Sequence, residues 1–293
     1  MSPRSTVTPL ILALAALLVA MASYQCGAAL AKRLFPLVGA QGATAFRLGL
    51  GALIMVSIRR PWRTKRTNAD WRAIWGYGLS LGVMNLVFYM ALRTIPLGIA
   101  VALEFTGPLA IALFHSRRAV DFVWIALAVI GLLLLLPLRE QSHALDPVGV
   151  MFALAAGVGW ALYIVFGQKA GAAYGKDAVT LGIVIGALVA VPIGVAHAGT
   201  ALLSLALLPF GLGVAILSSA LPYSLEMIAL TRLPARSFSV LLSLEPALAA
   251  LAGVALLGEQ LSAQQWMAIA AIIAASGGTA LAATKPVAEP LAN

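Results

Sequence analysis

The chain has 293 residues, of which 62% are hydrophobic and only 10% are charged, and its mean hydropathy is +1.00. Soluble domains carry about 25% charged residues, so these charges are too few to coat a water-soluble globule of this size. The composition therefore predicts an all-α, polytopic membrane protein. The net charge of +9 would suggest nucleic acid in a soluble protein. In a membrane protein, the distribution of the positive charge between the two membrane faces indicates the orientation of the chain. No nucleic-acid partner is expected.

A helix needs about 20 apolar residues to cross a bilayer core, and the polar and Pro/Gly clusters divide the chain into ten candidates. They run over 9–31, 42–58, 73–92, 97–115, 120–137, 147–167, 178–197, 207–230, 235–257 and 263–283. The first resembles a signal peptide, because Arg4 precedes an apolar run. We interpret it as a span, because the run continues past Cys26 to Ala31 and Gln25 stands where lipoprotein cleavage needs a small residue. The single cysteine excludes an internal disulfide.

Spans two and three contain polar residues at membrane depth. Arg47 lies five residues inside span two. It could pair with a substrate carboxylate or a buried glutamate, or its long stem could carry the charge to the surface. Asn85 and Tyr89 lie in the middle of span three, where they either line a pocket or pack.

Glycines four residues apart permit close helix contact, and they occur at Gly78 and Gly82 and at Gly182 and Gly186.

Glu104 is the eighth residue of span four, close to the midplane. A charged side chain in hydrocarbon costs at least ~2.5–3.5 kcal/mol. Pro108, one turn later, removes a backbone hydrogen bond and frees a carbonyl. Glu104 is either a proton site, an anchor for a substrate amine, or a neutral acid that bonds a neighbouring helix. In each case we expect it to face an internal cavity.

Aromatic and acidic residues also occur inside spans six, eight and nine. Trp160 and Tyr163 lie one turn apart on one face of span six, where they could wall a pocket, cover an ammonium by cation–π contact or simply pack. The same alternatives hold for Tyr223. Glu226 is about a turn from the cytoplasmic end of span eight, so we expect local pairing with Arg232 rather than substrate contact.

Glu245 lies just past the middle of span nine and directly precedes Pro246. This pair could place a second acid in the cavity, or it could simply bend the helix.

The distribution of lysine and arginine predicts the orientation. If the N-terminus is cytoplasmic, 14 of the 19 cationic residues fall on the cytoplasmic face and 4 on the other, and Arg47 falls inside span two. This asymmetry follows the positive-inside rule, and both termini are therefore expected in the cytoplasm.

Residues 91–121 and 229–259 match at a constant shift of 138. The shift superposes prolines and acids, pairing Pro96 with Pro234, Pro108 with Pro246, and Asp121 with Glu259. It is about half the chain, which predicts two five-helix repeats, residues 1–140 and 141–293. Five is odd, so the second repeat enters the membrane inverted, as in secondary transporters that bind substrate near the midplane. Glu104 and Glu245 are then expected to flank one cavity.

The stretch PALAALAGVALLGEQLSAQQWMAIAAIIAASG (246–277) resembles the second-repeat signature of the ten-span, EamA-type branch of the drug/metabolite transporter superfamily. The stretches LLVAMASYQCGAALAKRLFPLVGA, PLGIAVALEFTGPLAIAL, SRRAVDFVW and AILSSALPYSLEMIALTRLPAR are similar to the threonine/homoserine exporters of bacterial inner membranes. The resemblance covers nearly the whole chain and implies export of hydrophilic amino acids from the cytoplasm. Related exporters of this branch handle aromatic amino acids or cationic compounds such as viologens.

We therefore expect an inner-membrane amino-acid exporter that works by alternating access. Glu104 and Glu245 would receive the substrate ammonium or a coupling proton, and Arg47 could face the carboxylate. The other candidate pocket residues are Asn85, Tyr89, Trp160, Tyr163 and Tyr223. The alternative is a broad efflux transporter for cationic or aromatic compounds, suggested by acids beside aromatic rings. The sequence has no metal-ligand spacing, phosphate loop or nucleophile–base arrangement, so we expect no enzyme, metal or cofactor. Because both halves lie on one chain, we expect a monomer.

Overall fold

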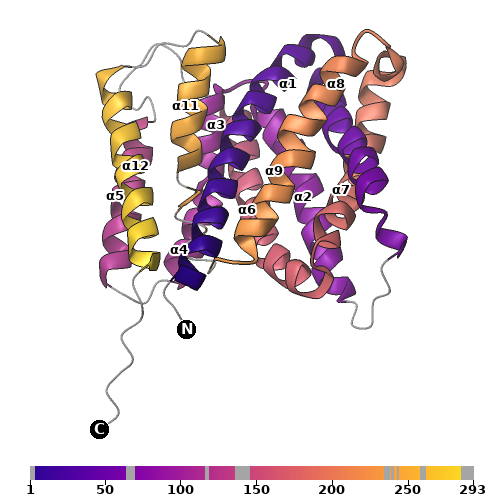
Figure 1. The fold of residues 1–293 in the computed structure, drawn as a ribbon. Coiled ribbons are helices and arrows are strands. Elements are labelled where there is room, and N and C mark those ends of the chain that lie inside the picture. The colour runs from indigo at the N-terminus through magenta and orange to yellow at the C-terminus, as the bar shows by residue number, and fades with distance from the viewer. Residues whose placement is uncertain are drawn as a thin grey trace.

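The computed structural model describes residues 4–63, 70–115, 119–135, 146–233, 238, 241–242, 244–257 and 262–284. Every regular element in these ranges is a helix, and the helices stand side by side as a bundle (Figure 1). The elements, in chain order, are α1 (Arg4–Arg59), η1 (Pro61–Arg63), α2 (Trp71–Ala91), α3 (Leu97–Glu104), α4 (Thr106–His115), α5 (Ala119–Leu135), α6 (Pro147–Tyr174), α7 (Asp177–Ala198), η2 (Gly199–Leu203), α8 (Leu208–Ala215), η3 (Ile216–Ala220), α9 (Leu221–Leu230), α11 (Leu244–Leu257) and α12 (Ala263–Thr284).

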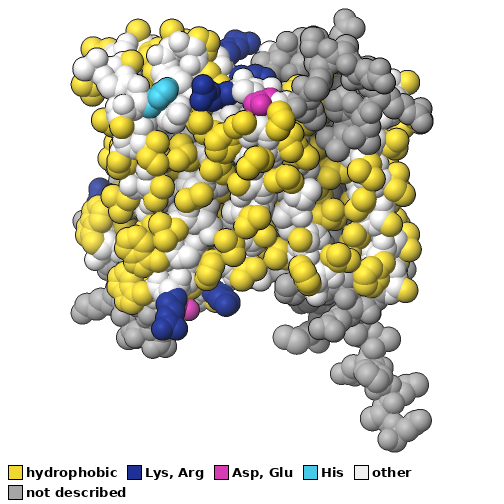
Figure 2. All heavy atoms as spheres, turned by 180° about the vertical axis from the view of Figure 1, so that it is seen from behind, with side chains coloured by type: hydrophobic (Ala, Val, Ile, Leu, Met, Phe, Trp, Pro, Cys, Tyr) yellow, Lys and Arg dark blue, Asp and Glu magenta, His cyan; other side chains and the backbone are white. Residues whose placement is uncertain are grey.

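The surface of the bundle fits a lipid environment. Within the described residues, five helical stretches are long and apolar enough to cross a membrane: Ile11–Arg59, Trp71–Ala91, Pro147–Tyr174, Asp177–Leu203 and Leu208–Leu230. Hydrophobic side chains cover the middle of the face in Figure 2, and charged side chains lie mainly toward its two ends. The prediction of an all-helical, polytopic membrane protein is confirmed at this level.

The first helix is two helices joined at a glycine. A straight helix of 56 residues would be about 84 Å long, whereas the bilayer core is about 30 Å thick. The chain therefore turns at Gly39, whose backbone has φ 70° and ψ 174°. Glycine adopts a positive φ without steric cost because it has no Cβ.

Prolines interrupt the helices that surround the centre of the bundle. The break between α3 and α4 falls at Phe105, where the N–H that Glu104 C=O would accept is missing because residue 108 is proline. Helix α11 begins at Leu244 and carries Pro246 in its first turn. These breaks place carboxyl-bearing residues at helix ends inside the bundle.

Glycines bring several helix backbones into direct contact. A Cβ atom at Gly82 of α2 would lie 2.8 Å from the Cα atom of Gly186 in α7, so these glycines do allow a close helix contact, and the structure shows that the two pairs meet each other. Helix α6 approaches two neighbours in the same way. A Cβ atom at Gly157 would lie 2.7 Å from the carbonyl oxygen of Glu104, and one at Gly159 would lie 2.9 Å from the Cβ atom of Met84.

Candidate functional site

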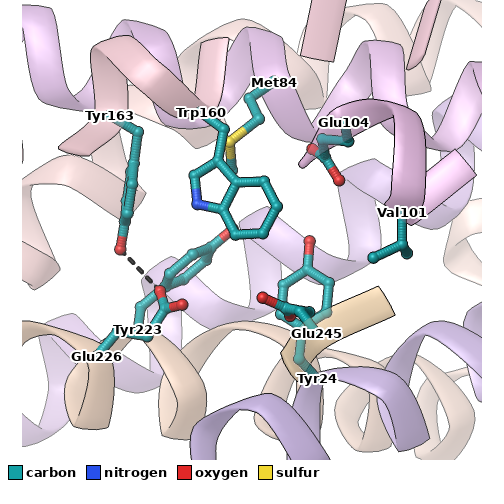
Figure 3. A pocket seen from close by; sticks show the side chains of 9 residues that line it. All are labelled: Tyr24, Met84, Val101, Glu104, Trp160, Tyr163, Tyr223, Glu226 and Glu245. Carbon is teal, nitrogen blue, oxygen red and sulfur yellow. Dashed lines mark hydrogen bonds between the residues drawn. The ribbon is translucent and has the colours of Figure 1, made fainter. Parts of the chain in front are cut away.

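A small cavity lies inside the bundle, and its volume of about 10 Å³ is room for about one water molecule. Helices α1, α2, α3, α6, α9 and α11 contribute its wall. The lining residues are Tyr24, Met84, Val101, Glu104, Trp160, Tyr163, Tyr223, Glu226 and Glu245 (Figure 3). All of them except the partly buried Tyr24 are buried, so a solute can reach the cavity only after the helices move.

Three carboxyl groups belong to this wall. Glu104, Glu226 and Glu245 are only 4%, 5% and 3% exposed. The Tyr163 hydroxyl donates to Oε2 of Glu226 at 2.9 Å, and Nε2 of Gln25 donates to Oε1 of Glu245 at 3.3 Å. Oε2 of Glu245 has no hydrogen-bond partner within the described part of the chain. The carboxyl groups of this site therefore accept hydrogen bonds from neutral donors at only some of their oxygen atoms.

Arg47 lies in the layer directly behind this wall. Its side chain is fully buried, so the alternative in which it reaches the surface is wrong. Nε and Nη2 donate to the carbonyl oxygen of Ser218 at 3.1 and 2.8 Å, and Nη2 also donates to the Tyr223 hydroxyl at 3.1 Å. Cζ lies 4.5 Å from the centroid of the Tyr24 ring and 5.2 Å from that of Tyr89. Nε also donates to the Ser219 hydroxyl at 3.2 Å, so the cation is held by one carbonyl, two hydroxyls and aromatic faces.

The carbonyl that binds Arg47 is free because of a local feature of the sequence. The N–H of Leu221 bonds to Ile216 C=O across a single π-helical turn at Ile216–Ala220, and Pro222 has no N–H to offer Ser218 four residues earlier. Wide turns of this kind occur frequently at functional sites. A second carbonyl of the turn, that of Leu217, accepts from the Ser23 hydroxyl at 2.8 Å. Both halves of α1 therefore dock on this turn.

The remaining polar residues connect the wall to this layer. Nδ2 of Asn85 donates to the Tyr223 hydroxyl at 2.6 Å and to Leu81 C=O at 2.7 Å. The Tyr163 and Tyr223 rings have centroids 5.9 Å apart. Tyr89 is fully buried and faces Arg47.

The structure places all eight candidate residues in one region, in two layers. Five line the cavity itself: Glu104, Trp160, Tyr163, Tyr223 and Glu245. Arg47, Asn85 and Tyr89 stand behind them. Within the described residues, no group of His, Cys, Asp and Glu side chains could hold a metal ion.

Sequence reasoning missed part of the wall. Glu226 does not pair locally with Arg232 as expected, because it points into the cavity and accepts from Tyr163, whereas Arg232 is exposed. The available signal was spacing: Glu226 follows Tyr223 by three residues and therefore lies on the same helix face. Tyr24, which lies between two polar residues in span one, was also missed.

Comparison with known proteins agrees with this geometry. The sequence profile of the EamA-like transporter family matches residues 147–281. The chain is 57% identical over 277 residues to the threonine/homoserine exporter RhtA of Escherichia coli K12, covering 94% of both chains. It is 56% identical over 273 residues to the protein of the same name from Salmonella typhimurium LT2, covering 93% of this chain and 92% of the other. A solved crystal structure that is 19% identical shares the fold, with a TM-score of 0.70 over 95% of this chain and 99% of the other. The resemblance inferred from the sequence is confirmed, and the chain belongs to the EamA-like family of drug/metabolite transporters, close to the proteins named threonine/homoserine exporters.

Proposed function

We propose that this protein exports amino acids, threonine and homoserine among them, from the cytoplasm across the bacterial inner membrane. The observation that carries the proposal is an enclosed, carboxyl-lined cavity inside a chain 57% identical to threonine/homoserine exporters. Membership of a transporter family sets the protein apart from enzymes, and its substrate leaves the cavity chemically unchanged.

The charges around the cavity suit a zwitterion. The substrate ammonium, or a proton that is exchanged for it, would be received by Glu104, Glu226 and Glu245. Arg47 would receive the carboxylate, because its Nη1 is buried without a partner in the described structure. The Tyr24 and Tyr223 rings contact the guanidinium and line the cavity, whereas Arg47 does not line it, so a contact of Arg47 with substrate would require side chains of the wall to move.

The proposed architecture is ten spans in two inverted repeats, residues 1–140 and 141–293. Under the shift of 138, α5 corresponds to residues 257–273, which overlap α12, and α5 packs against α12. The same shift places α4 on residues 244–253, which belong to α11. Asn85 and Tyr223 are equivalent positions and form a hydrogen bond. In a pair of repeats related by a twofold axis, equivalent residues meet only at that axis. The proline breaks before Glu245 and after Glu104 are also equivalent, as expected for interrupted transporter helices.

The two repeats would work by alternating access. The cavity lies between elements of both halves and is closed in this structure, so rocking of one half against the other would open it to each side in turn. Both termini would be cytoplasmic: α1 begins and α12 ends at the same end of the bundle (Figure 1), and the excess of lysine and arginine assigns that side to the cytoplasm. A single chain contains both halves, so we propose a functional monomer.

Counterflow in proteoliposomes tests the substrate class without any ion gradient. Vesicles loaded with unlabelled threonine should accumulate labelled threonine, and homoserine should compete. Empty liposomes give the background. Strong inhibition by an organic cation with none by zwitterionic amino acids would overturn the proposal in favour of cation efflux.

A further inference from the structure

The indole of Trp160 is the largest side chain in the wall of the cavity. Figure 3 shows it between the pair Tyr163 and Tyr223 on one side and Glu104 on the other. The side chain is 6% exposed. The cavity volume is only about 10 Å³, which is room for about one water molecule, whereas ligand pockets commonly have ~300–1,000 Å³. The volume left for a substrate therefore depends on this indole.

Backbone contacts on both sides of α6 fix the position of this ring. Gly157 packs against the carbonyl of Glu104, and Gly159 packs against Met84. Both contacts lie within three residues of Trp160, and at Gly157 the opposing atoms are backbone, which cannot rotate away. The Phe105 ring also meets the indole edge-on, with centroids 6.4 Å apart. Helix α6 consequently cannot retreat, and its indole cannot swing past Phe105, without disturbing these contacts.

We infer that Trp160 sets the upper size limit of the substrate side chain, so that the cavity accepts short polar side chains and rejects aromatic ones. The inference rests on the proposed function and narrows its substrate class. A substrate ring would need the volume that the indole fills. When the two halves close around a substrate, the packed interior has few voids and little compliance, so the neighbouring helices supply little of this volume.

The experiment compares amino acids of different size in the same counterflow assay. Trp160→Ala and Trp160→Phe are measured beside Trp75→Ala, a matched control because Trp75 is 45% exposed on α2 and lies outside the cavity wall. The readout is the ratio of initial phenylalanine to threonine counterflow. A single methylene in an apolar pocket changes discrimination by about 10–200-fold. We expect the ratio to rise at least ~10-fold in Trp160→Ala, less in Trp160→Phe, and not at all in Trp75→Ala.

The controls separate the inference from the function on which it rests. If wild-type protein shows no threonine counterflow, the proposed function fails and the inference fails with it. If wild type and both Trp160 variants move threonine but the ratio is unchanged, the inference alone is overturned. If both variants fold with wild-type thermal transitions but lose threonine counterflow, Trp160 holds the substrate rather than limiting its size, which also contradicts the inference.

Discussion

Arg47 is expected to stabilise the fold mainly through its hydrogen bonds to the backbone carbonyl of Ser218. Replacing Arg47 with Met removes the guanidinium while keeping an apolar side chain of similar reach. Ser218 C=O would then lack a donor, because Pro222 offers none. An orphaned buried acceptor costs about 1–3 kcal/mol, and single hydrogen bonds measured inside membrane proteins reach at most ~1.7 kcal/mol. We therefore expect the carbonyl to contribute about 1–2 kcal/mol.

A double-mutant cycle with Pro222→Ala isolates this contribution. The new N–H lies four residues after Ser218 and can take the place of the guanidinium. Arg47→Met also removes the desolvation cost of a buried cation and the contacts with the aromatic rings. Both effects occur in the wild-type background and in the Pro222→Ala background alike, so they cancel in the coupling free energy of the cycle.

The assay is thermal unfolding of the detergent-solubilised protein. About 2–4 °C per kcal/mol is typical of domains somewhat smaller than this chain, so Arg47→Met should lower Tm by several degrees in the wild-type background and by clearly less with Pro222→Ala. Equal losses in both backgrounds would refute the reasoning.

Three further expectations follow. Glu104→Gln should reduce gradient-driven export more than threonine exchange, because exchange needs no coupling proton; unimpaired transport of both kinds would remove Glu104 from the mechanism. Gly82→Val should destabilise the protein by at least about 1–3 kcal/mol, because its side chain meets the α7 backbone. Gly98→Ala, whose Cβ would lie 3.9 Å from its nearest neighbour, should be neutral, and equal unfolding midpoints for the two variants would contradict this. The Thr94 hydroxyl and the first amides of α6 hold the pKa of the Asp146 carboxyl below its ordinary value of 3.8. The ionised Asp146 carboxylate therefore stabilises the folded state. This contribution to the free energy of unfolding is complete above pH 3.8 and is lost as the pH falls through the lower pKa of the folded state. The difference in Tm between the wild type and Asp146→Ala should therefore be constant near neutral pH and become smaller in acid. A difference that grows in acid would contradict the assignment.

Hydropathy and the cost of buried charge could be read from the sequence because both are properties of single segments. A run of apolar residues predicts a helix in lipid whatever its partners are, and a glutamate at mid-span predicts an internal cavity. The glycine spacing on α2 and α7 indicated that each helix permits a close neighbour, but that Gly82 meets Gly186 came only from the structure.

The surroundings of Arg47 and Glu226 could not be predicted, because they depend on pairs of helices distant in sequence. Pro222 indicates that a carbonyl is freed, but nothing local indicates that Arg47, 171 residues from Ser218, would occupy it. The position of Glu226 near a helix end predicted pairing with Arg232, six residues later in the sequence. Its inward orientation instead follows from Tyr163 on α6, which donates to it across the cavity.

The central claim is that threonine binds in the cavity between the two halves, and substrate protection of a cysteine tests it most directly. Val101→Cys places a thiol in the cavity wall, in a background where the exposed native Cys26 is changed to Ser. Thr200→Cys, on the exposed helix η2, is the control. In variants that retain counterflow, threonine and homoserine should slow maleimide modification at position 101 and leave position 200 unchanged. Modification at position 101 that is insensitive to saturating threonine would contradict the account.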